Sequence, residues 1–248
     1  MRNIDLNCDM GEGMGNEAFL LPFISSANIA CGYHAGDADE MKRIVDCCIK
    51  NNVAIGAHPS YPDKENFGRT TQYLSTNEIY LLVKKQLEIL HTIVVAAGAT
   101  LNHVKPHGAL YNMAAKDAAI AHAIAIAVKD FSAELIYYGL SGSVMIEEAK
   151  NIGLQTAQEV FADRTYQPDG SLTPRCETNA LITDAAIALQ QVLQMVNNNT
   201  VTTTNGETIA LHADTICIHG DGIHAVRFAE ELNNCLQKAG INIKKINY

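Results

Sequence analysis

Short apolar runs alternate with longer amphipathic stretches along the whole chain. Repeated strand–helix units of this kind imply a mainly parallel sheet. About seven such units fit a closed or nearly closed β/α barrel better than an open sheet, so we expect an α/β fold of that type. The runs with the length and composition of buried strands are Ile4–Cys8, Ala27–Cys31, Val53–Ala57, Leu101–Val104, Leu135–Gly139, Thr156–Phe161 and Thr215–Ile218.

The helical stretches carry recognisable start signals. Asp37 is followed three residues later by Glu40, and Ser75 by Glu78, which is the spacing of a capping box in both places. Apolar positions at helical spacing follow each signal. Further helices are expected near residues 115–130, 142–152, 178–197 and 223–239.

The length of 248 residues fits one large domain, so we expect a single barrel domain over residues 1–248. One interruption stands out near residues 200–211, where two β-prone runs flank Asn205-Gly206. This dipeptide suits a type I′ turn, and the segment is predicted to be a small hairpin insertion.

Polar residues recur on strands that should be apolar. Asp5, Asn7 and Asp9 share one face of the first strand, because side chains alternate along a strand. One such residue alone is ordinarily a hydrogen-bonded structural group. Recurrence near successive strand ends is harder to explain by packing, since burying unpaired charge is expensive. In β/α barrels the C-terminal strand ends hold the active site. The other polar positions of this kind are His58, His103, Lys105, His107, Glu159, Asp163, His219 and Asp221.

Lys105 leaves its strand in the segment Lys105-Pro106-His107-Gly108. Lys is almost never buried unless it is paired. One interpretation is a solvated lysine on a loop. The other is a cation that faces a carboxylate or phosphate of a substrate.

A metal site is an open alternative. His103 and His107 have the H-x₃-H spacing, but Pro106 favours extended chain, which would place the two about 13 Å apart, too far to share one ion. A set that could converge from separate loops is Asp9, Glu12, His34 and His58.

Phosphate-binding motifs are scarce. The chain has no Walker-type loop. Gly220-Asp221-Gly222 leads into a predicted helix, where free backbone N–H groups would favour an anion.

Composition narrows the classes of partner. A net charge of −9 argues against nucleic-acid binding, and the apolar stretch Ala118–Val128 is too short to span a membrane. The seven cysteines are an odd number without a C-x-x-C motif, and no charged-then-apolar leader is visible, which together favour a cytoplasmic protein. Cys31, in a Gly-rich segment, is the best candidate for a catalytic thiol, although a small buried cysteine is the commoner case.

Several blocks of sequence resemble the LamB/YcsF family of prokaryotic 5-oxoprolinase A subunits, and together they span nearly the whole chain. The hairpin around Asn205-Gly206 is the part that the family pattern places least well. The blocks are DLNCDMGEG from Asp5, NIACGYHAGD from Asn28, GAHPSYPD from Gly56, FGR from Phe67, VKPHGALYN from Val104, EVFADR from Glu159 and IHGD from Ile218.

The resemblance implies ATP-dependent opening of 5-oxoproline to glutamate together with two partner subunits, B and C. It also implies a barrel related to the glycoside hydrolase/deacetylase group, which keeps a divalent metal in view. ATP is expected in the complex, although not necessarily on this chain. A lactam carbonyl is a poor electrophile, and phosphorylation of its oxygen would make the ring carbon open to attack by water.

Such chemistry needs a base for water, an acid for the departing nitrogen, and cations for phosphate and carboxylate. The residues expected to be catalytic are Asp9, Glu12, His58, Lys105, His107, Glu159 and Asp221. Those expected to bind substrate or phosphate are Asn7, His34, Arg69, Arg164, His219, Gly220 and Gly222.

Within that set, Asp9 or Glu12 is the expected base, and His58 or His107 the expected proton shuttle. Lys105 and Arg164 would bind the anionic groups. Two other functions stay open. One is a metal-dependent deacetylase or amidohydrolase that acts alone, and the other is a non-catalytic subunit that only binds the lactam.

Overall fold

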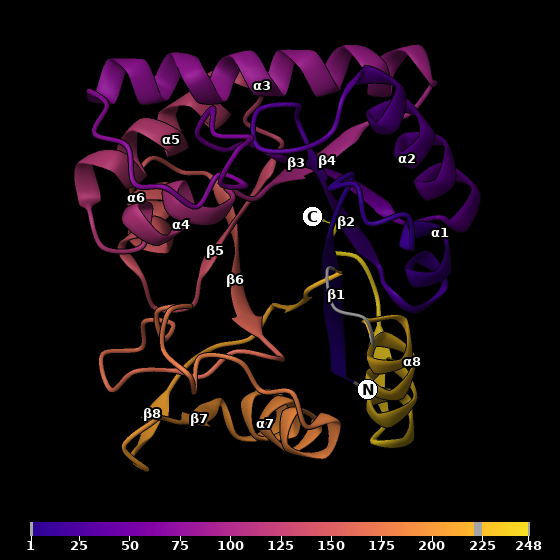
Figure 1. The fold of residues 1–248 in the computed structure, drawn as a ribbon, viewed down its shortest axis with the longest axis vertical. Coiled ribbons are helices and arrows are strands. Elements are labelled where there is room, and N and C mark those ends of the chain that lie inside the picture. Colours follow the sequence, from indigo (N-terminus) through magenta and orange to yellow (C-terminus); the bar gives the residue numbers. More distant parts are fainter. Residues whose placement is uncertain (1, 221–224, 248) are drawn as a thin grey trace.

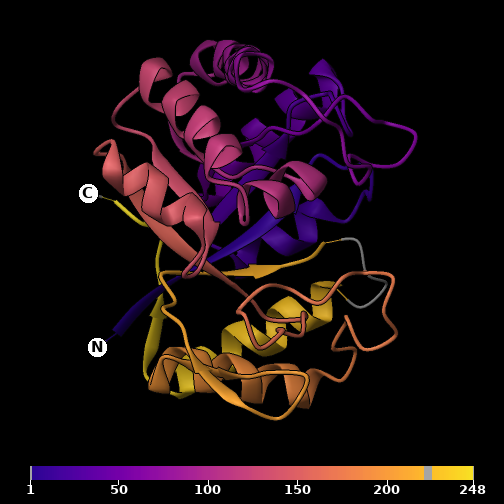
Figure 2. The ribbon, with the colours of Figure 1, turned by 90° about the vertical axis from the view of Figure 1, so that its left-hand side faces the viewer.

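The structure, a computed structural model, describes residues 2–220 and 225–247. Parallel strands form a closed barrel of seven strands in the order β1-β2-β3-β4-β5-β6-β9, and the pairing of β1 with β9 closes the ring. Helices surround the strands (Figures 1 and 2). The barrel strands are β1 (Arg2–Met10), β2 (Ser26–Ala30), β3 (Ala54–His58), β4 (Leu101–Val104), β5 (Ile136–Leu140), β6 (Gln155–Phe161) and β9 (Thr215–Ile218).

Three further strands lie outside this ring. β10 (Ile241–Ile243) pairs in parallel with the start of β1. The antiparallel pair β7 (Thr200–Thr202) and β8 (Thr208–Ala210) occupies the segment expected to form a hairpin. The helices are α1 (Glu17–Leu20), a 3₁₀ turn (Leu21–Phe23), α2 (Ala38–Asn51), α3 (Thr76–Ala96), α4 (Gly108–Ala114), α5 (Ala118–Phe131), α6 (Val144–Asn151), α7 (Ala185–Asn198) and α8 (Ala225–Lys238).

The expected fold class is therefore confirmed, and each end of the seven predicted strands lies within two residues of the observed end. Both capping boxes mark real helix starts: the Asp37 side chain accepts from the Glu40 backbone, and Ser75 and Glu78 cap α3 reciprocally. The helix expected to begin near residue 178 begins later, because the Asp184 side chain accepts from the first backbone N–H groups of α7.

The turn in the hairpin differs from the expected type. A type I′ turn joins two strands through two residues that both have positive φ. Here residues 203–207 separate the strands, and the Thr203 N–H donates to the Glu207 carbonyl. Gly206 has a φ of 85°, whereas Asn205 is not in the left-handed region. The prediction of a type I′ turn was wrong because the loop is longer.

The two faces of the strands have different surroundings. Leu6 and Cys8 are fully buried among the apolar side chains between strands and helices. Asn7 points the other way into the lumen, where its amide donates to Thr215 Oγ1 (2.7 Å) and its oxygen accepts from Asn28 (2.7 Å). The polar parity in the sequence thus marks the lumen. Among the described residues, no helix combines the length and apolar character needed to cross a membrane.

Candidate active site

A pocket opens at the end of the barrel where the parallel strands finish. Strands β1, β3, β4, β6 and β9 deliver polar side chains to it, either from their last residues or from the loops that follow. This end is the one at which β/α barrels build active sites. The titratable residues that line the pocket are Asp9, Glu12, His58, Arg69, Lys105, His107, Tyr111, Arg164, Arg175 and His219.

Lys105 lines this pocket and is only 2% exposed. Its Nζ is 2.9 Å from Asp9 Oδ1 and 2.8 Å from Glu159 Oε1. Tyr111 donates its hydroxyl to the other oxygen of Glu159 (2.8 Å). The buried lysine is therefore paired, and its charge is shared by two carboxylates of the chain itself rather than lying in solvent.

The partners of Asp9 decide its protonation. Its Oδ1 accepts from Lys105 and from Asn28 (2.8 Å), and its Oδ2 lies 3.3 Å from His58 Nε2. Burial opposes ionisation, but His58 and Lys105 outweigh it and hold the pKa of Asp9 well below its ordinary value. Asp9 is consequently a carboxylate at neutral pH.

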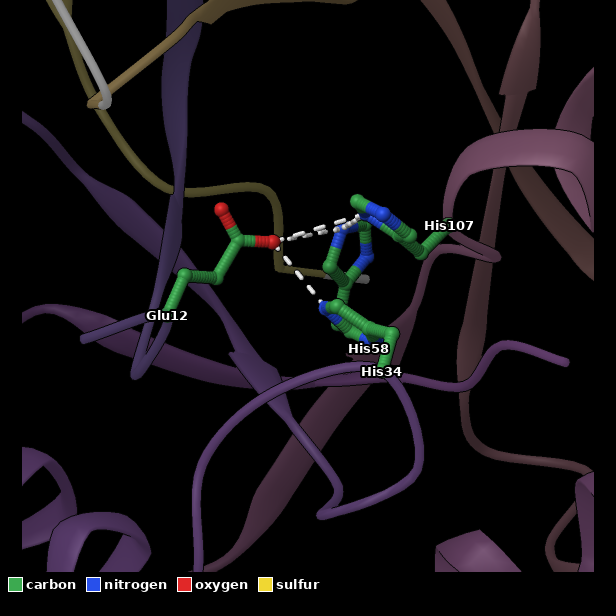
Figure 3. Close-up of side chains that lie close together, drawn as sticks. All are labelled: Glu12, His34, His58 and His107. Carbon is green, nitrogen blue, oxygen red and sulfur yellow. Dashed lines mark hydrogen bonds and ion pairs between the residues drawn. The ribbon is translucent and has the colours of Figure 1, made fainter. Parts of the chain in front are cut away.

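Glu12 and three histidines form a second cluster (Figure 3). His58 connects this cluster to Asp9. The Glu12 Oε1 atom is 3.0 Å from His34 Nε2, 3.4 Å from His107 Nδ1 and 3.9 Å from His58 Nε2. His58 Nε2 and His107 Nδ1 are 2.9 Å apart. One donor atom from each of the four residues lies within 4.8 Å of all the others, which is close enough for them to share one metal ion.

The outer nitrogens of His58 and His107 are held by backbone carbonyls. His58 Nδ1 is 2.7 Å from the Lys105 oxygen, and His107 Nε2 is 2.9 Å from the Phe67 oxygen. A carbonyl can only accept, so both of these nitrogens carry hydrogen. In the neutral rings, the inner nitrogens therefore present lone pairs to the cluster.

His34 is held in the same way by a hydroxyl. Ser60 donates its hydroxyl to the Tyr61 carbonyl (3.0 Å), so it accepts from His34 Nδ1 (2.8 Å). The Nε2 lone pair of a neutral His34 then faces the Glu12 carboxylate.

Burial shapes the electrostatics of this cluster. It lowers the pKa of His34 to about 2, with nearby His58 acting in the same direction. Burial, followed by His34 and His58, also holds the pKa of His107 well below its usual value. Burial and the adjacent Asp9 raise the pKa of Glu12. The rings of His34 and His107 are thus held neutral.

The loop before α3 holds the imidazoles in place from outside. Phe67, whose carbonyl binds His107, has a φ of 57°, a conformation that non-glycine residues rarely adopt. Gly68 follows with a φ of 66°, and a Cβ there would lie 2.9 Å from both His107 Cδ2 and His34 Cβ. Asp63 stabilises this loop by accepting from the backbone of Thr70 (3.1 Å). The sequence resemblance marked Phe67-Gly68-Arg69, but only the structure gives the reason.

A third group includes His219 and Arg175, which also line the pocket. His219 Nδ1 is 2.8 Å from Asp163 Oδ1, and the exposed Arg175 donates to His219 Nε2 (2.7 Å). Burial works against ionisation of Asp163, but His219 outweighs it and lowers the pKa of that carboxyl. Sequence reasoning missed Arg175, because it lies in the long loop between β6 and α7 without periodicity or a motif.

The remaining predicted residues fall into different places. Arg164 lines the pocket but donates to the Thr173 carbonyl (2.5 Å) and the Ala180 carbonyl (3.2 Å), so it braces the β6–α7 loop. Arg69 lies at the pocket, 4.9 Å from the centre of the Phe67 ring. Asp221 and Gly222 lie outside the described residues, whereas Gly220 lines the pocket.

His103 and Cys31 take structural positions. His103 Nε2 is bound to Asn28 (2.8 Å) in the lumen, apart from His107. Cys31 is buried, and burial raises the pKa of its thiol to about 12. That thiol is protonated at neutral pH and is poorly suited to act as a nucleophile.

Comparison with known proteins identifies the family of the chain. Residues 4–248 match the LamB/YcsF family. The chain is 52% identical to the A subunit of 5-oxoprolinase from Tolumonas auensis, over 98% of this chain and 99% of that protein. It is 53% identical to the corresponding A subunit from Shouchella clausii over the full length of both.

Solved structures agree on the fold. The lactam utilization protein from Thermus thermophilus superposes with a TM-score of 0.91 at 38% identity, covering 98% of this chain and 100% of that one. A family 4 carbohydrate esterase from Streptomyces lividans shares 12% identity and a TM-score of 0.52, covering 99% and 93%, which is a likeness of fold alone. On these grounds, the chain belongs to the LamB/YcsF family.

Proposed function

We propose that this chain is the A subunit of a 5-oxoprolinase and contributes the site at which ATP-dependent hydrolysis opens 5-oxoproline to L-glutamate. The observation that carries the proposal is the pocket at the strand ends, which brings carboxylates, imidazoles and guanidinium groups together. Relatives about as long as this chain and 52% identical to it are named as the A subunit of 5-oxoprolinase, and this supports the same substrate here.

The proposed reaction divides between activation and attack. Transfer of the ATP γ-phosphoryl group to the lactam oxygen would make the ring carbon electrophilic. Water then adds to that carbon and the ring C–N bond breaks, which leaves an acyl phosphate. A second water hydrolyses this acyl phosphate to the carboxylate and phosphate. We assign the resulting needs to groups of this pocket: one to accept a proton from water, one to give a proton to nitrogen, and cations to hold the anions.

Asp9 is the base in this assignment. It lines the pocket, and its low pKa keeps it ionised, so it is always in the form that accepts a proton. Lys105 holds one of its oxygens at 2.9 Å and thereby orients the other. Lys105 is accordingly a positioning residue for Asp9 and Glu159, which refines the expectation that it faces a substrate anion.

His219 is the better candidate for the acid. The outer N–H groups of His58 and His107 are bound by backbone carbonyls, and their inner nitrogens face each other at 2.9 Å rather than the open pocket. His219 is instead oriented by Asp163, and its Nε2 faces the exposed Arg175. Exchange of this Arg175 contact for a substrate anion would free Nε2 to carry a proton to the ring nitrogen.

Two arginines at the pocket are assigned to bind the anionic groups of the substrate and of ATP. Arg175 and Arg69 are exposed and line it, and both can reach a carboxylate or a phosphoryl group. Partner subunits B and C are part of the proposal and would complete the complex, including the binding of ATP. We place this complex in the cytoplasm, which agrees with seven cysteines that are all free thiols.

The test is a glutamate-release assay with 5-oxoproline, run with and without ATP and with and without subunits B and C. We expect ATP-dependent release only from the complete set. Glutamate release by this chain alone without ATP would instead support the alternative function, a metal-dependent amidohydrolase that uses the histidine cluster. Full turnover by a complex that carries both Asp9→Asn and His219→Asn would leave this chain a lactam-binding subunit.

A further inference from the structure

The four donor atoms of the Glu12, His34, His58 and His107 cluster conflict with one another as they stand. His58 Nε2 and His107 Nδ1 are 2.9 Å apart, yet both rings use their other nitrogen as the donor to a backbone carbonyl. When both rings are neutral, two lone pairs therefore face each other. His34 Nε2 faces a Glu12 oxygen at 3.0 Å in the same way. Electron-rich atoms this close need a positive centre between them.

Two protons would relieve these contacts, one between His58 and His107 and one between His34 and Glu12. They would occupy two separate places in a buried cluster whose His34 and His107 rings are stacked with their centroids 3.8 Å apart. A single dication among the four atoms relieves both contacts at once.

We propose that Glu12, His34, His58 and His107 bind one divalent transition-metal ion of the Zn²⁺ class at the inner wall of the pocket. Zn–N bonds of about 2.0–2.1 Å in a tetrahedron place neighbouring donor atoms about 3.3–3.4 Å apart. The corresponding separations in the structure, 2.9, 3.0, 3.4 and 3.9 Å, lie on both sides of that value. Small shifts of the side chains thus suffice to form the site.

The ligand chemistry selects the type of ion. Three imidazoles and one carboxylate suit Zn²⁺ and its first-row neighbours, whereas Mg²⁺ and Ca²⁺ prefer oxygen ligands. The outer nitrogens are already held by Lys105, Phe67 and Ser60, which is how metal-binding histidines are commonly oriented. A bound ion of this class would supply a Lewis acid beside Asp9.

The set differs from the one expected from sequence. Glu12, His34 and His58 do converge, but the fourth member is His107 rather than Asp9. One oxygen of Asp9 is bound by Lys105 and Asn28. The H-x₃-H argument was sound for His103 and His107 as a pair, since only His107 reaches the cluster.

Metal content of the isolated full-length chain tests the proposal. The chain is stripped with a chelator, loaded with Zn²⁺ or Co²⁺, passed through a desalting column and analysed by elemental mass spectrometry. We expect about one equivalent of either ion per chain, a higher Tm on loading, and visible d–d bands for Co²⁺ with nitrogen ligands. The assay contains no ATP, 5-oxoproline or partner subunit, so its outcome is independent of the proposed reaction.

Variants assign the ligands. His34→Gln and His107→Gln should each weaken Zn²⁺ binding by about tenfold or more. His122→Gln is the control, since His122 is exposed and bound to Glu148 on the surface. Circular dichroism of the metal-free chains identifies a variant that fails to fold, and Glu12→Gln, which conserves shape, then replaces it.

Two results would overturn the site. One is the failure of the unaltered chain to retain Zn²⁺ or Co²⁺ after desalting. The other is retention by folded His34→Gln, His107→Gln and Glu12→Gln chains at the level of His122→Gln, which would place the ion elsewhere.

Discussion

Two aspartates on the same strand, four positions apart and facing the same lumen, have opposite surroundings. Asp5 is fully enclosed at the start of the barrel, whereas Asp9 reaches the pocket at its other end. Both carboxylates lie on one face of β1, where Asp5 is buried and Asp9 is half-buried. The comparison separates what burial does from what partners do.

Asp5 is surrounded by neutral hydroxyl groups. It accepts from Ser25, Ser26 and Thr215 at 2.6 Å each and from Tyr138 at 3.1 Å. Burial raises the pKa of Asp5, and these hydrogen bonds offset the rise only in part. The arrangement is closed and fully bonded, so it joins strands rather than performing chemistry.

Asp9 instead faces cations and titratable rings. Lys105 and His58 outweigh burial and lower its pKa, so the carboxylate persists next to an open pocket. A parity pattern in the sequence marks both residues equally. The kind of partner distinguishes the structural group from the proposed base, and those partners come from other strands.

The sharpest test of this comparison replaces each aspartate by asparagine. Asp9→Asn should lower kcat of the reconstituted complex by about 10²–10⁴-fold, because a proton acceptor is lost. Asp5→Asn should leave kcat near that of the unaltered complex while lowering stability. Glutamate release and urea unfolding measure the two effects. Equal loss of kcat in both folded variants would show that Asp9 has no special role.

Lys105→Met tests the role of the charged partners of Asp9 by its effect on the free energy of unfolding. Removal of the ammonium leaves Asp9 and Glu159 as buried carboxylates without their cation. Breaking such a pair typically costs about 3–5 kcal/mol, and we expect a loss of that size in urea unfolding at pH 7. Lys50→Met is the matched control, because Lys50 is exposed on α2, and surface changes usually stay within about 0.5 kcal/mol. A similar stability for both variants would contradict the pairing of Lys105.

The barrel fold could be predicted from the sequence because local signals specify its strands and helices. Strand runs and caps such as Asp37 and Ser75 depend on neighbours in the chain. The short helix α4 and strand β10 escaped prediction, since elements this short carry too little periodicity. β10 is defined by its pairing with β1, which no local pattern reports.

Most residues of the candidate site could be predicted from the sequence, but which of them contact one another could not. His34, His58 and His107 come from three separate segments, and only closure of the barrel brings their rings together. Arg175 carried no signal, because its role depends on contact with His219. Lys105 showed a polar position on an apolar strand, but its two carboxylate partners lie on β1 and β6.

The dependence of stability on pH should also separate the two aspartates. The pKa of Asp9 is lower in the folded state, so its contribution is present above the unfolded value of about 3.9 and is lost as pH falls through the folded pKa. The pKa of Asp5 is raised, so its ionisation reduces stability as pH rises above that same unfolded value. The two effects oppose each other in the acid range.

Urea unfolding between about pH 5 and pH 3 measures this balance. Asp9→Asn should flatten the loss of stability with falling pH, and Asp5→Asn should make it steeper. The same slope in both variants would mean that the two carboxyl groups do not differ in the assigned way.

The smallest expected effect comes from one hydroxyl at the closed end. Tyr138→Phe removes the 3.1 Å hydrogen bond to Asp5 and keeps the ring that stacks on His103 with a centroid distance of 4.2 Å. Three shorter hydroxyl donors remain on Asp5, so the loss of stability should be about 1 kcal/mol, with kcat unchanged.

Tyr111→Phe is the counterpart at the pocket, where the hydroxyl binds Glu159 beside Lys105. That bond is to a carboxylate within the ionic group, so about 1.5–3 kcal/mol and part of kcat/KM should be lost. Each substitution removes one tyrosine hydroxyl group. A fall in kcat for Tyr138→Phe as large as that for Tyr111→Phe would therefore show that the Asp5 end of the lumen also takes part in turnover.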